Sequence, residues 1–452
     1  MSIPSFFDRE RTVAEPGYNR WLVPPAALSI HLAIGQAYSL SVFNLPMSKL
    51  VGLTHSAPDD WPLTTTVWIF SIALAILGLS AAFFGTWMER VGPRLAMFAA
   101  ALTFGGGFLV AALGITLHQI VLVYFGYGVI GGIGLGIGYI SPVSTLMKWF
   151  PDRPGMATGL AIMGFGGGAL IGSPLATALM DRYRSATSAG VAETFTTMGV
   201  VYLAFMMFGV FAVRVPAPDW KPSHWVPSAA PQRLITQASV SANRAIVTPQ
   251  FWLLWGVLFC NVTAGIGVLS QASPMIQEVF AGRITASAAA GFVGLLSIFN
   301  LVGRFLWSSL SDRLGRKRTY TIYFVLGALL YCVVPQAGKI GSVVLFVSSF
   351  AVVLSMYGGG FATIPAYLRD MFGIYQIGAI HGRLLTAWSA AALTGPPIVT
   401  YLRSFALTHG ATSAGAYTIT MYVMGSILVV GFLCNLAIGP VSARHHLQRM
   451  QP

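Results

Sequence analysis

Long apolar runs divide this chain from end to end, and each is about as long as a bilayer's hydrocarbon core is thick. A helix needs roughly 20 apolar residues to cross that core. Because backbone groups in lipid must be hydrogen-bonded within their own segment, such runs are restricted to helices. We predict twelve transmembrane helices, at residues 22–45, 64–88, 93–116, 119–147, 157–180, 197–215, 250–276, 286–309, 319–336, 341–367, 383–403 and 416–438.

The composition agrees with an all-α integral membrane protein. Of the 452 residues, 55% are hydrophobic and 9% are charged, whereas soluble domains carry about 25% charged residues. The net charge of +13 would suit a nucleic-acid partner. The basic residues are, however, spread over short loops, which is typical of membrane topology. We therefore expect a lipid bilayer as the surroundings and no nucleic-acid partner.

The charge bias between loops predicts the orientation. An even number of spans places both termini on one side, and the segments of that side hold 19 Lys and Arg residues against 6 on the other. The positive-inside rule then places both termini in the cytoplasm. Residues 1–20 lack the apolar region and cleavage site of a signal peptide, so the first span should act as an uncleaved insertion signal.

The sequence predicts two halves joined by a linker. Residues 22–215 and 250–438 each hold six spans, the proline-rich segment 216–249 is a cytoplasmic linker, and 1–21 and 439–452 are cytoplasmic tails. GTWMERVGPR at 85–94 matches SSLSDRLGRK at 308–317 at an offset of 223. Two parallel six-span repeats are the pattern of a transporter with its substrate site near the bilayer midplane between halves.

The repeated turn predicts a gate at the cytoplasmic membrane edge. A glycine permits the sharp reversal, an acidic residue lies near a helix end, and arginines stay in the cytoplasm. The candidate gating residues are Gly85, Glu89, Arg90, Gly92, Arg94, Asp312, Arg313, Gly315 and Arg316.

Arg304 is the strongest candidate for substrate binding. It precedes Asp312 by eight residues, which places it roughly 12 Å inside the helix end, and Asn300 lies one turn earlier on the same face. The equivalent residues of the first half are Ala81 and Leu77, so the architecture does not require a charge here. A cation at this depth usually faces an aqueous cavity. The alternative is that Arg304 reaches the cytoplasmic edge or binds backbone carbonyls.

The acidic residues fall in loops or at span ends, which favours an anionic substrate for Arg304. A guanidinium donates two parallel hydrogen bonds to a carboxylate, so a carboxylate is the expected substrate class. His31 is the one deep candidate for a proton relay, although such a residue is more often structural. Exchange of anions needs no internal proton site. Aromatic residues that could line the cavity are Tyr38, Tyr139, Tyr357, Phe361 and Trp388.

The sequence does not favour an enzyme or a cofactor. The glycine-rich fourth and fifth spans have no strand–turn–helix context for a dinucleotide, and small residues at such spacing allow close helix packing. We find no Ser-His-Asp set, metal cluster or phosphate loop in a usable context. We expect no cofactor.

The two repeated turns resemble the signature loop of the major facilitator superfamily. Within it, the chain is similar to the oxalate/formate antiporter family, which is close to the monocarboxylate transporters. The segments that carry this resemblance are QAYSLSVF (36–43), YISPVSTLMKWFPDRPGMATGL (139–160), TPQFW (248–252), TAGIGVLSQASP (263–274) and the Asn300–Arg304 pair.

The resemblance implies that Arg304 binds the substrate carboxylate, and that Asn300, Tyr38, Tyr139, Tyr357 and Phe361 occupy cavity positions. One departure matters, because the family's oxalate carrier has a second cation, a Lys, in the eleventh span where this chain has Trp388. One cation suits a monocarboxylate such as formate, lactate or pyruvate better than a dianion.

We therefore expect a monomeric carrier of the bacterial inner membrane that moves small carboxylates by alternating access, with a counter-anion or a proton as the second partner. Two alternatives stay open, a proton-coupled monocarboxylate symporter and an efflux carrier for apolar compounds in which Arg304 is structural.

Overall fold

The computed structural model describes residues 5–53, 55–218, 220–223, 225, 234–236, 238–412 and 415–447. These residues are almost entirely helical, and the β structure among them is an isolated bridge between Val13 and Val215. By their contacts they form two compact units. Unit 1 comprises Met1–Asp152, Leu160–Trp225 and His381–Thr386, and unit 2 comprises Arg153–Gly159, Val226–Ile380 and Ala387–Pro452.

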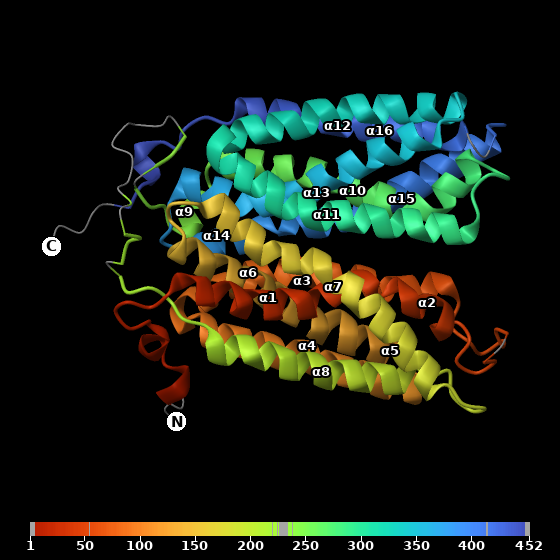
Figure 1. The fold of residues 1–452 in the computed structure, drawn as a ribbon, viewed down its shortest axis with the longest axis horizontal. Helices are drawn as coiled ribbons and strands as arrows, with labels where there is room; N and C mark the ends of the chain where they lie inside the picture. The colour runs from red at the N-terminus through yellow and green to blue at the C-terminus, as the bar shows by residue number, and fades with distance from the viewer. Residues whose placement is uncertain are drawn as a thin grey trace. The chain divides into compact units, whose positions relative to one another are not determined.

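Unit 1 is built on the helices of the first half of the chain (Figure 1). Helix α4 packs against α6 and α8, and α1 also packs against α6 and α8. A π-helical stretch, η5 (Tyr124–Gly131), joins α5 to α6. The helices are α1 (Val23–Ile34), α2 (Ser41–Met47), α3 (Leu63–Val91), α4 (Pro93–Thr116), α5 (Ile120–Val123), α6 (Gly132–Trp149), α7 (Pro154–Tyr183) and α8 (Val191–Ala212).

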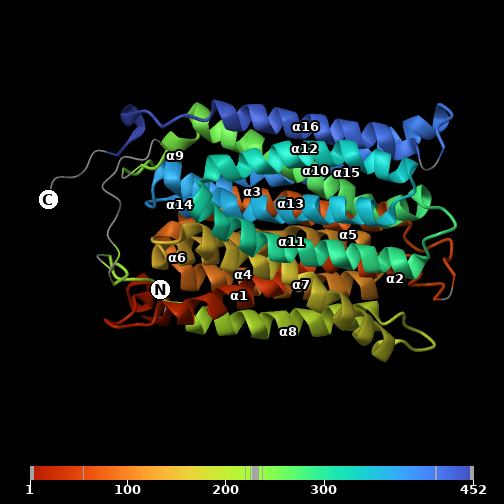
Figure 2. The ribbon, with the colours of Figure 1, turned by 45° about the horizontal axis from the view of Figure 1, so that its top comes forward.

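Unit 2 is built on the helices of the second half. Helix α11 packs along α13, and α12 runs beside α16, as Figures 1 and 2 both show. The helices of this half are α9 (Ala242–Ala245), α10 (Pro249–Val279), α11 (Ala286–Leu314), α12 (Arg316–Lys339), α13 (Val343–Phe372), α14 (Ile377–Leu384), α15 (Thr386–Thr408) and α16 (Thr418–Ala437). The end of α14 and the first residue of α15 belong to unit 1.

Most of these helices are suited to a membrane. Among the described residues, ten are long and apolar enough to cross a bilayer, or eleven if the bent pair Arg20–Ser39 and Ser41–Met47 forms one span. Helix α15 occupies the place of the eleventh predicted span but is not among them, because its 23 residues include polar side chains and two prolines. The protein is an all-α, multi-pass membrane protein.

The linker predicted at 216–249 holds one short helix among its described residues, α9. Residues 219, 224, 226–233 and 237 of the linker and 448–452 of the C-terminal tail lie outside the described part of the chain. The predicted domain boundaries, with tails at 1–21 and 439–452 and halves at 22–215 and 250–438, remain predictions.

Each unit takes a short segment from the opposite half of the chain, and the two segments make matching contacts. In unit 2, a Cβ on Gly159 would lie 3.1 Å from the carbonyl oxygen of Arg304. In unit 1, a Cβ on Gly382 would overlap the carbonyl oxygen of Ala81. Gly382 follows Gly159 by the repeat offset of 223, and Ala81 precedes Arg304 by the same offset, so the two contacts join equivalent positions of the repeat. The internal repeat thus extends from sequence to helix packing.

The loop before α3 is organised by one carboxylate. Asp60 is buried, and its two oxygens accept three backbone N–H groups, from Val51 at 2.7 Å, Ala57 at 2.8 Å and Gly52 at 3.0 Å. Burial alone would raise the pKa of Asp60, but these three donors outweigh it and hold the pKa below its usual value.

We predict that Asp60→Asn lowers the stability of this loop by about 1–2 kcal/mol, because an amide replaces one acceptor oxygen by a donor. The carboxylate's contribution is fully present above the usual Asp pKa of about 3.9 and is lost as pH falls through the lower folded-state pKa. Thermal melting of the detergent-solubilised protein should therefore separate the variant from the wild type at neutral pH and less at strongly acidic pH. Asp59→Asn, at an exposed neighbour, is the control, and an equal loss in both variants would contradict the assignment.

Candidate functional site

Arg304 lies in the interior of α11 and has no exposed surface. Its Nε donates a hydrogen bond of 2.9 Å to Oδ1 of Asn300, one turn earlier. Its guanidinium carbon lies 5.4 Å from the ring centroid of Phe361, within the range of a cation–π contact. The guanidinium is therefore fixed from two sides, by an amide on its own helix and by a ring on α13.

Two glycines allow α11 to approach α13 closely at this level. A Cβ on Gly303 would overlap the backbone of Ser355, and a Cβ on Gly358 would overlap the carbonyl oxygen of Asn300. Small residues at such crossings let membrane helices come into backbone contact. The face of α11 that carries Asn300 and Arg304 is thereby pressed against α13.

Three further predicted residues surround this pair in unit 2. The ring centroids of Tyr357 and Phe361 are 5.2 Å apart, and those of Phe361 and Trp388 are 4.5 Å apart. All three side chains are buried. Unit 2 thus brings together five of the seven predicted substrate-binding residues, linked through Phe361.

The other two predicted residues, Tyr38 and Tyr139, lie in unit 1. Both contact Phe165 of α7, with centroid distances of 5.0 Å and 5.5 Å. Phe165 was missing from the predicted set, although it precedes Trp388 by the repeat offset of 223, which could have identified it. Each unit therefore contains an aromatic group, and the equivalent positions Phe165 and Trp388 both belong to these groups.

Two histidines also meet Tyr139 in unit 1. Nε2 of His31 lies 3.1 Å from the carbonyl oxygen of Tyr139, and the two rings stack at 5.2 Å. The ring of His381 lies 5.8 Å from that of Tyr139. The sequence suggested only His31 as a candidate proton relay. His381 was not considered because it precedes the predicted start of the eleventh span at residue 383.

The second copy of the repeated turn forms a buried ion-pair network. Asp312 accepts the backbone N–H groups of Gly155 and Met156 at 2.8 and 2.9 Å and pairs with Arg316 at 2.6 Å. Arg316 also pairs with Asp370 at 3.1 Å, a residue that the sequence did not single out. The turn itself is made by Gly315 at φ +86°. Arg313, by contrast, is exposed.

The first copy of the turn has different partners. Glu89 pairs with Lys148 at 3.3 Å, and Arg94 donates to the carbonyl oxygen of Phe6 at 2.8 Å, with its guanidinium carbon 4.6 Å from the Phe6 ring. Gly92 makes the turn at φ +87°. Gly85 is buried and Arg90 is exposed. The two turns share a backbone shape but not a network of charges.

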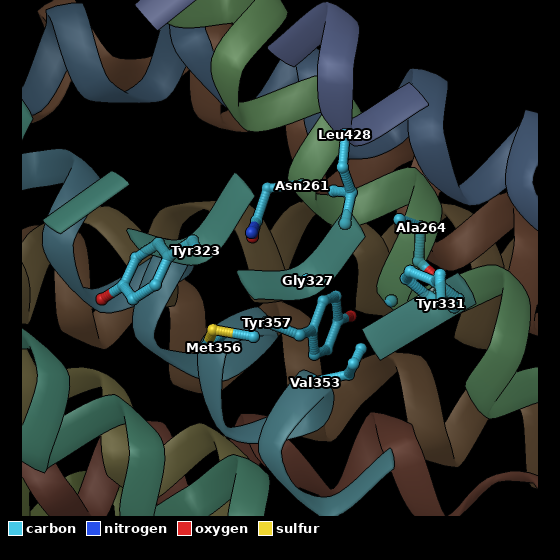
Figure 3. A pocket seen from close by; sticks show the side chains of 10 residues that line it. Asn261, Ala264, Tyr323, Gly327, Tyr331, Val353, Met356, Tyr357 and Leu428 are labelled. Atoms are coloured by element: carbon cyan, nitrogen blue, oxygen red, sulfur yellow. Dashed lines mark hydrogen bonds between the residues drawn. The ribbon is translucent and has the colours of Figure 1, made fainter. Parts of the chain in front are cut away.

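A small cavity lies inside unit 2 beside Tyr357 (Figure 3). Its volume is about 10 Å³, and Asn261, Tyr323 and Tyr331 also line it. A space of this size accommodates one water molecule, so it is too small for an organic anion. Arg304 is not among its lining residues. Across the described residues, no cluster of three or more His, Cys, Asp or Glu side chains is placed to hold a metal ion.

The profile described as "Major Facilitator Superfamily" matches residues 20–396. The chain is 25% identical to the oxalate:formate antiporter of Oxalobacter formigenes, over 83% of each chain. It is 26% identical to apicoplast pyruvate carrier 1 of Toxoplasma gondii, over 75% of this chain and 70% of that one. Among solved structures, the proton:xylose symporter XylE superposes with a TM-score of 0.68 at 15% identity, covering 92% and 94% of the two chains.

We predict that Arg316→Ala destabilises unit 2 by about 3–5 kcal/mol, because it leaves two mostly buried carboxylates, Asp312 and Asp370, without their shared cation. Arg313→Ala removes an exposed arginine three residues away and should change stability by less than about 0.5 kcal/mol. Thermal melting of the purified variants compares them. Equal melting temperatures for the two variants would contradict a structural network.

Proposed function

Because the chain belongs to the major facilitator superfamily, we propose that it is a secondary active transporter of small organic carboxylates that works by alternating access. Monocarboxylates such as formate, lactate or pyruvate are its proposed substrates. Fold and family are those of membrane transporters and not of enzymes.

The geometry of Arg304 carries this proposal. A guanidinium buried in a membrane helix is costly, and such residues are associated with substrate pathways. The bond from its Nε to Asn300 fixes the plane of the group. A carboxylate would then be recognised through the two Nη groups, which donate parallel hydrogen bonds.

The aromatic residues would form the walls of the site. Phe361 and Trp388 offer apolar faces for a short carbon skeleton, and Tyr357 adds a hydroxyl. Tyr38 and Tyr139 remain proposed as substrate-binding residues on the sequence pattern alone. In this assignment Arg304 supplies the binding energy, while the rings exclude anions with a second charge.

The relatives support the substrate class. An oxalate:formate antiporter and a pyruvate carrier both carry small carboxylates by name, and both align over most of this chain. Trp388, in place of a second cation, favours a substrate with one carboxylate.

The remaining assignments follow from the sequence pattern. The carrier is proposed to lie in the bacterial inner membrane as a monomer with both termini in the cytoplasm. The turns containing Gly85, Glu89, Arg90, Gly92 and Arg94, and Asp312, Arg313, Gly315 and Arg316, would act as cytoplasmic gates. In the second turn, breaking the Asp312–Gly155 contact would release the start of α7 from α11.

Counterflow in proteoliposomes tests the proposal. Vesicles preloaded with unlabelled formate, lactate or pyruvate should accumulate the same labelled anion. Arg304→Lys keeps the charge but loses the planar fork, so the initial rate should fall about 10- to 100-fold, which corresponds to roughly 1.4–2.8 kcal/mol.

Arg184→Lys, at an exposed arginine in unit 1, is the matched control and should transport normally. Full activity of Arg304→Lys and Arg304→Ala would refute a substrate role for Arg304 and favour the efflux carrier. The absence of counterflow with any carboxylate, in folded wild-type protein, would refute the proposed substrate class.

A second experiment tests why the substrate has one charge. Trp388→Lys places a second cation beside the Phe361 ring and should raise the ratio of oxalate to formate uptake about tenfold or more. Trp388→Phe keeps an aromatic side chain and should leave the preference for monocarboxylates unchanged. An unchanged ratio in a folded Trp388→Lys protein would show that this position does not determine substrate charge.

A further inference from the structure

We infer that His31 and His381 form a proton-binding site that couples transport to the proton gradient, an inference that rests on the proposed function. The two side chains come from distant parts of the chain, α1 and α14, and both belong to unit 1. They meet the same residue, Tyr139 of α6. The sequence pattern did not predict that these two histidines lie near the same residue.

The pair is buried and polar. His31 has no exposed surface and His381 has 1%. His31 is held by the backbone of Tyr139 through Nε2. Within the described residues, neither ring nitrogen of His381 has a hydrogen-bond partner. An imidazole buried in this way is costly as a structural element, since a packing role needs no polar nitrogen.

The internal repeat shows that the fold does not require these histidines. At the offset of 223, His381 corresponds to Thr158, Tyr139 to Ala362 and His31 to Leu254. Thr158 donates a hydrogen bond of 2.6 Å to the carbonyl oxygen of Ala362. A small hydroxyl side chain therefore satisfies the same helix contact in unit 2, and the imidazoles of unit 1 serve another purpose.

The surroundings of the pair define its charge. The titratable groups that face His381 are His31 from α1 and Tyr139 from α6, and Arg383 lies two residues further along its own segment. From α3 the backbone of Ala81 meets Gly382, and from α7 Gly164 meets His31. Two neighbouring imidazoles repel when both are charged, so the pair holds at most one proton as a unit.

One shared proton suits the transport of a monoanion. The proton binds an imidazole nitrogen from one compartment and leaves the same nitrogen into the other, so no bond other than N–H is made or broken. A carrier loaded with one anion and one proton has the same net charge as the empty carrier. The membrane potential then does not oppose uptake of the anion.

His381 lies near a junction between two helices, since Leu384 ends α14 and Thr386 begins α15. In the inferred mechanism, movement at this junction changes the distance between the two imidazoles. Separation of the two imidazoles would change their affinity for the shared proton. Proton binding and conformation are therefore coupled reciprocally.

The test separates exchange from proton coupling in the same proteoliposomes. Counterflow of labelled formate, lactate or pyruvate at equal pH measures carboxylate transport alone. Uptake into vesicles without internal anion, driven by an acidic exterior, measures proton coupling, and a trapped pH dye reports proton entry. Both are measured for the wild type, His31→Gln, His381→Gln and the control His409→Gln, which changes an exposed histidine.

We expect gradient-driven uptake and proton entry in the wild type and in His409→Gln. His31→Gln and His381→Gln should keep counterflow but lose gradient-driven uptake at least tenfold. Counterflow without gradient-driven uptake in the wild type would overturn the inference and leave an anion exchanger. Gradient-driven uptake retained in His381→Gln would overturn it as well. The absence of counterflow with every anion would instead refute the proposed function.

If a histidine variant fails to fold, the wild-type protein still tests whether transport is coupled to protons. Addition of the transported carboxylate to proteoliposomes should then carry protons inward in a one-to-one ratio with the anion, and the pH dye measures this directly. A ratio of zero would overturn the inference.

Discussion

The burial of one guanidinium is the constraint on which the organisation of unit 2 depends. Arg304 has no exposed surface, and a bare cation at such depth costs several kcal/mol. A hydrogen bond to Asn300 and a cation–π contact with Phe361 offset part of this cost. The contact with Phe361 needs α11 to lie against α13, which Gly303 and Gly358 permit by backbone contact. In this unit, the burial of the Arg304 charge therefore depends on the close packing of α11 against α13.

The charged residues of the two repeated turns have different partners. In the second copy, Arg316 satisfies Asp312 and Asp370 at once, and Asp312 also receives two N–H groups at the start of α7. Buried ion pairs persist only where such geometry compensates for lost hydration. In the first copy, Arg94 instead binds the N-terminal segment at Phe6. The two turns can therefore respond differently when helices move, although their glycines adopt the same backbone shape.

Local periodicity was enough to predict the helical fold and the Asn300–Arg304 pair, because residues four apart share a helix face. It did not reveal the π-helical stretch Tyr124–Gly131 or the bend near Ser39, which depend on packing against other helices. It also missed Asp370, Phe165 and His381, whose partners lie far away in sequence. Such contacts are set by tertiary structure, and the internal repeat could have indicated Phe165 alone, through its equivalent Trp388.

The repeat separates architecture from function. Where both copies do the same mechanical work, the residues match, as Gly159 and Gly382 do at their helix crossings. Where they differ, chemistry has been added to one copy, with Arg304 opposite Ala81 and His381 opposite Thr158. The added groups are basic in both cases, and each is supported by a ring from a neighbouring helix. Since the other copy has Ala81 and Thr158 at these positions, the repeated architecture does not specify either basic group, so one can bind an anion and the other a proton, with a different unit holding each.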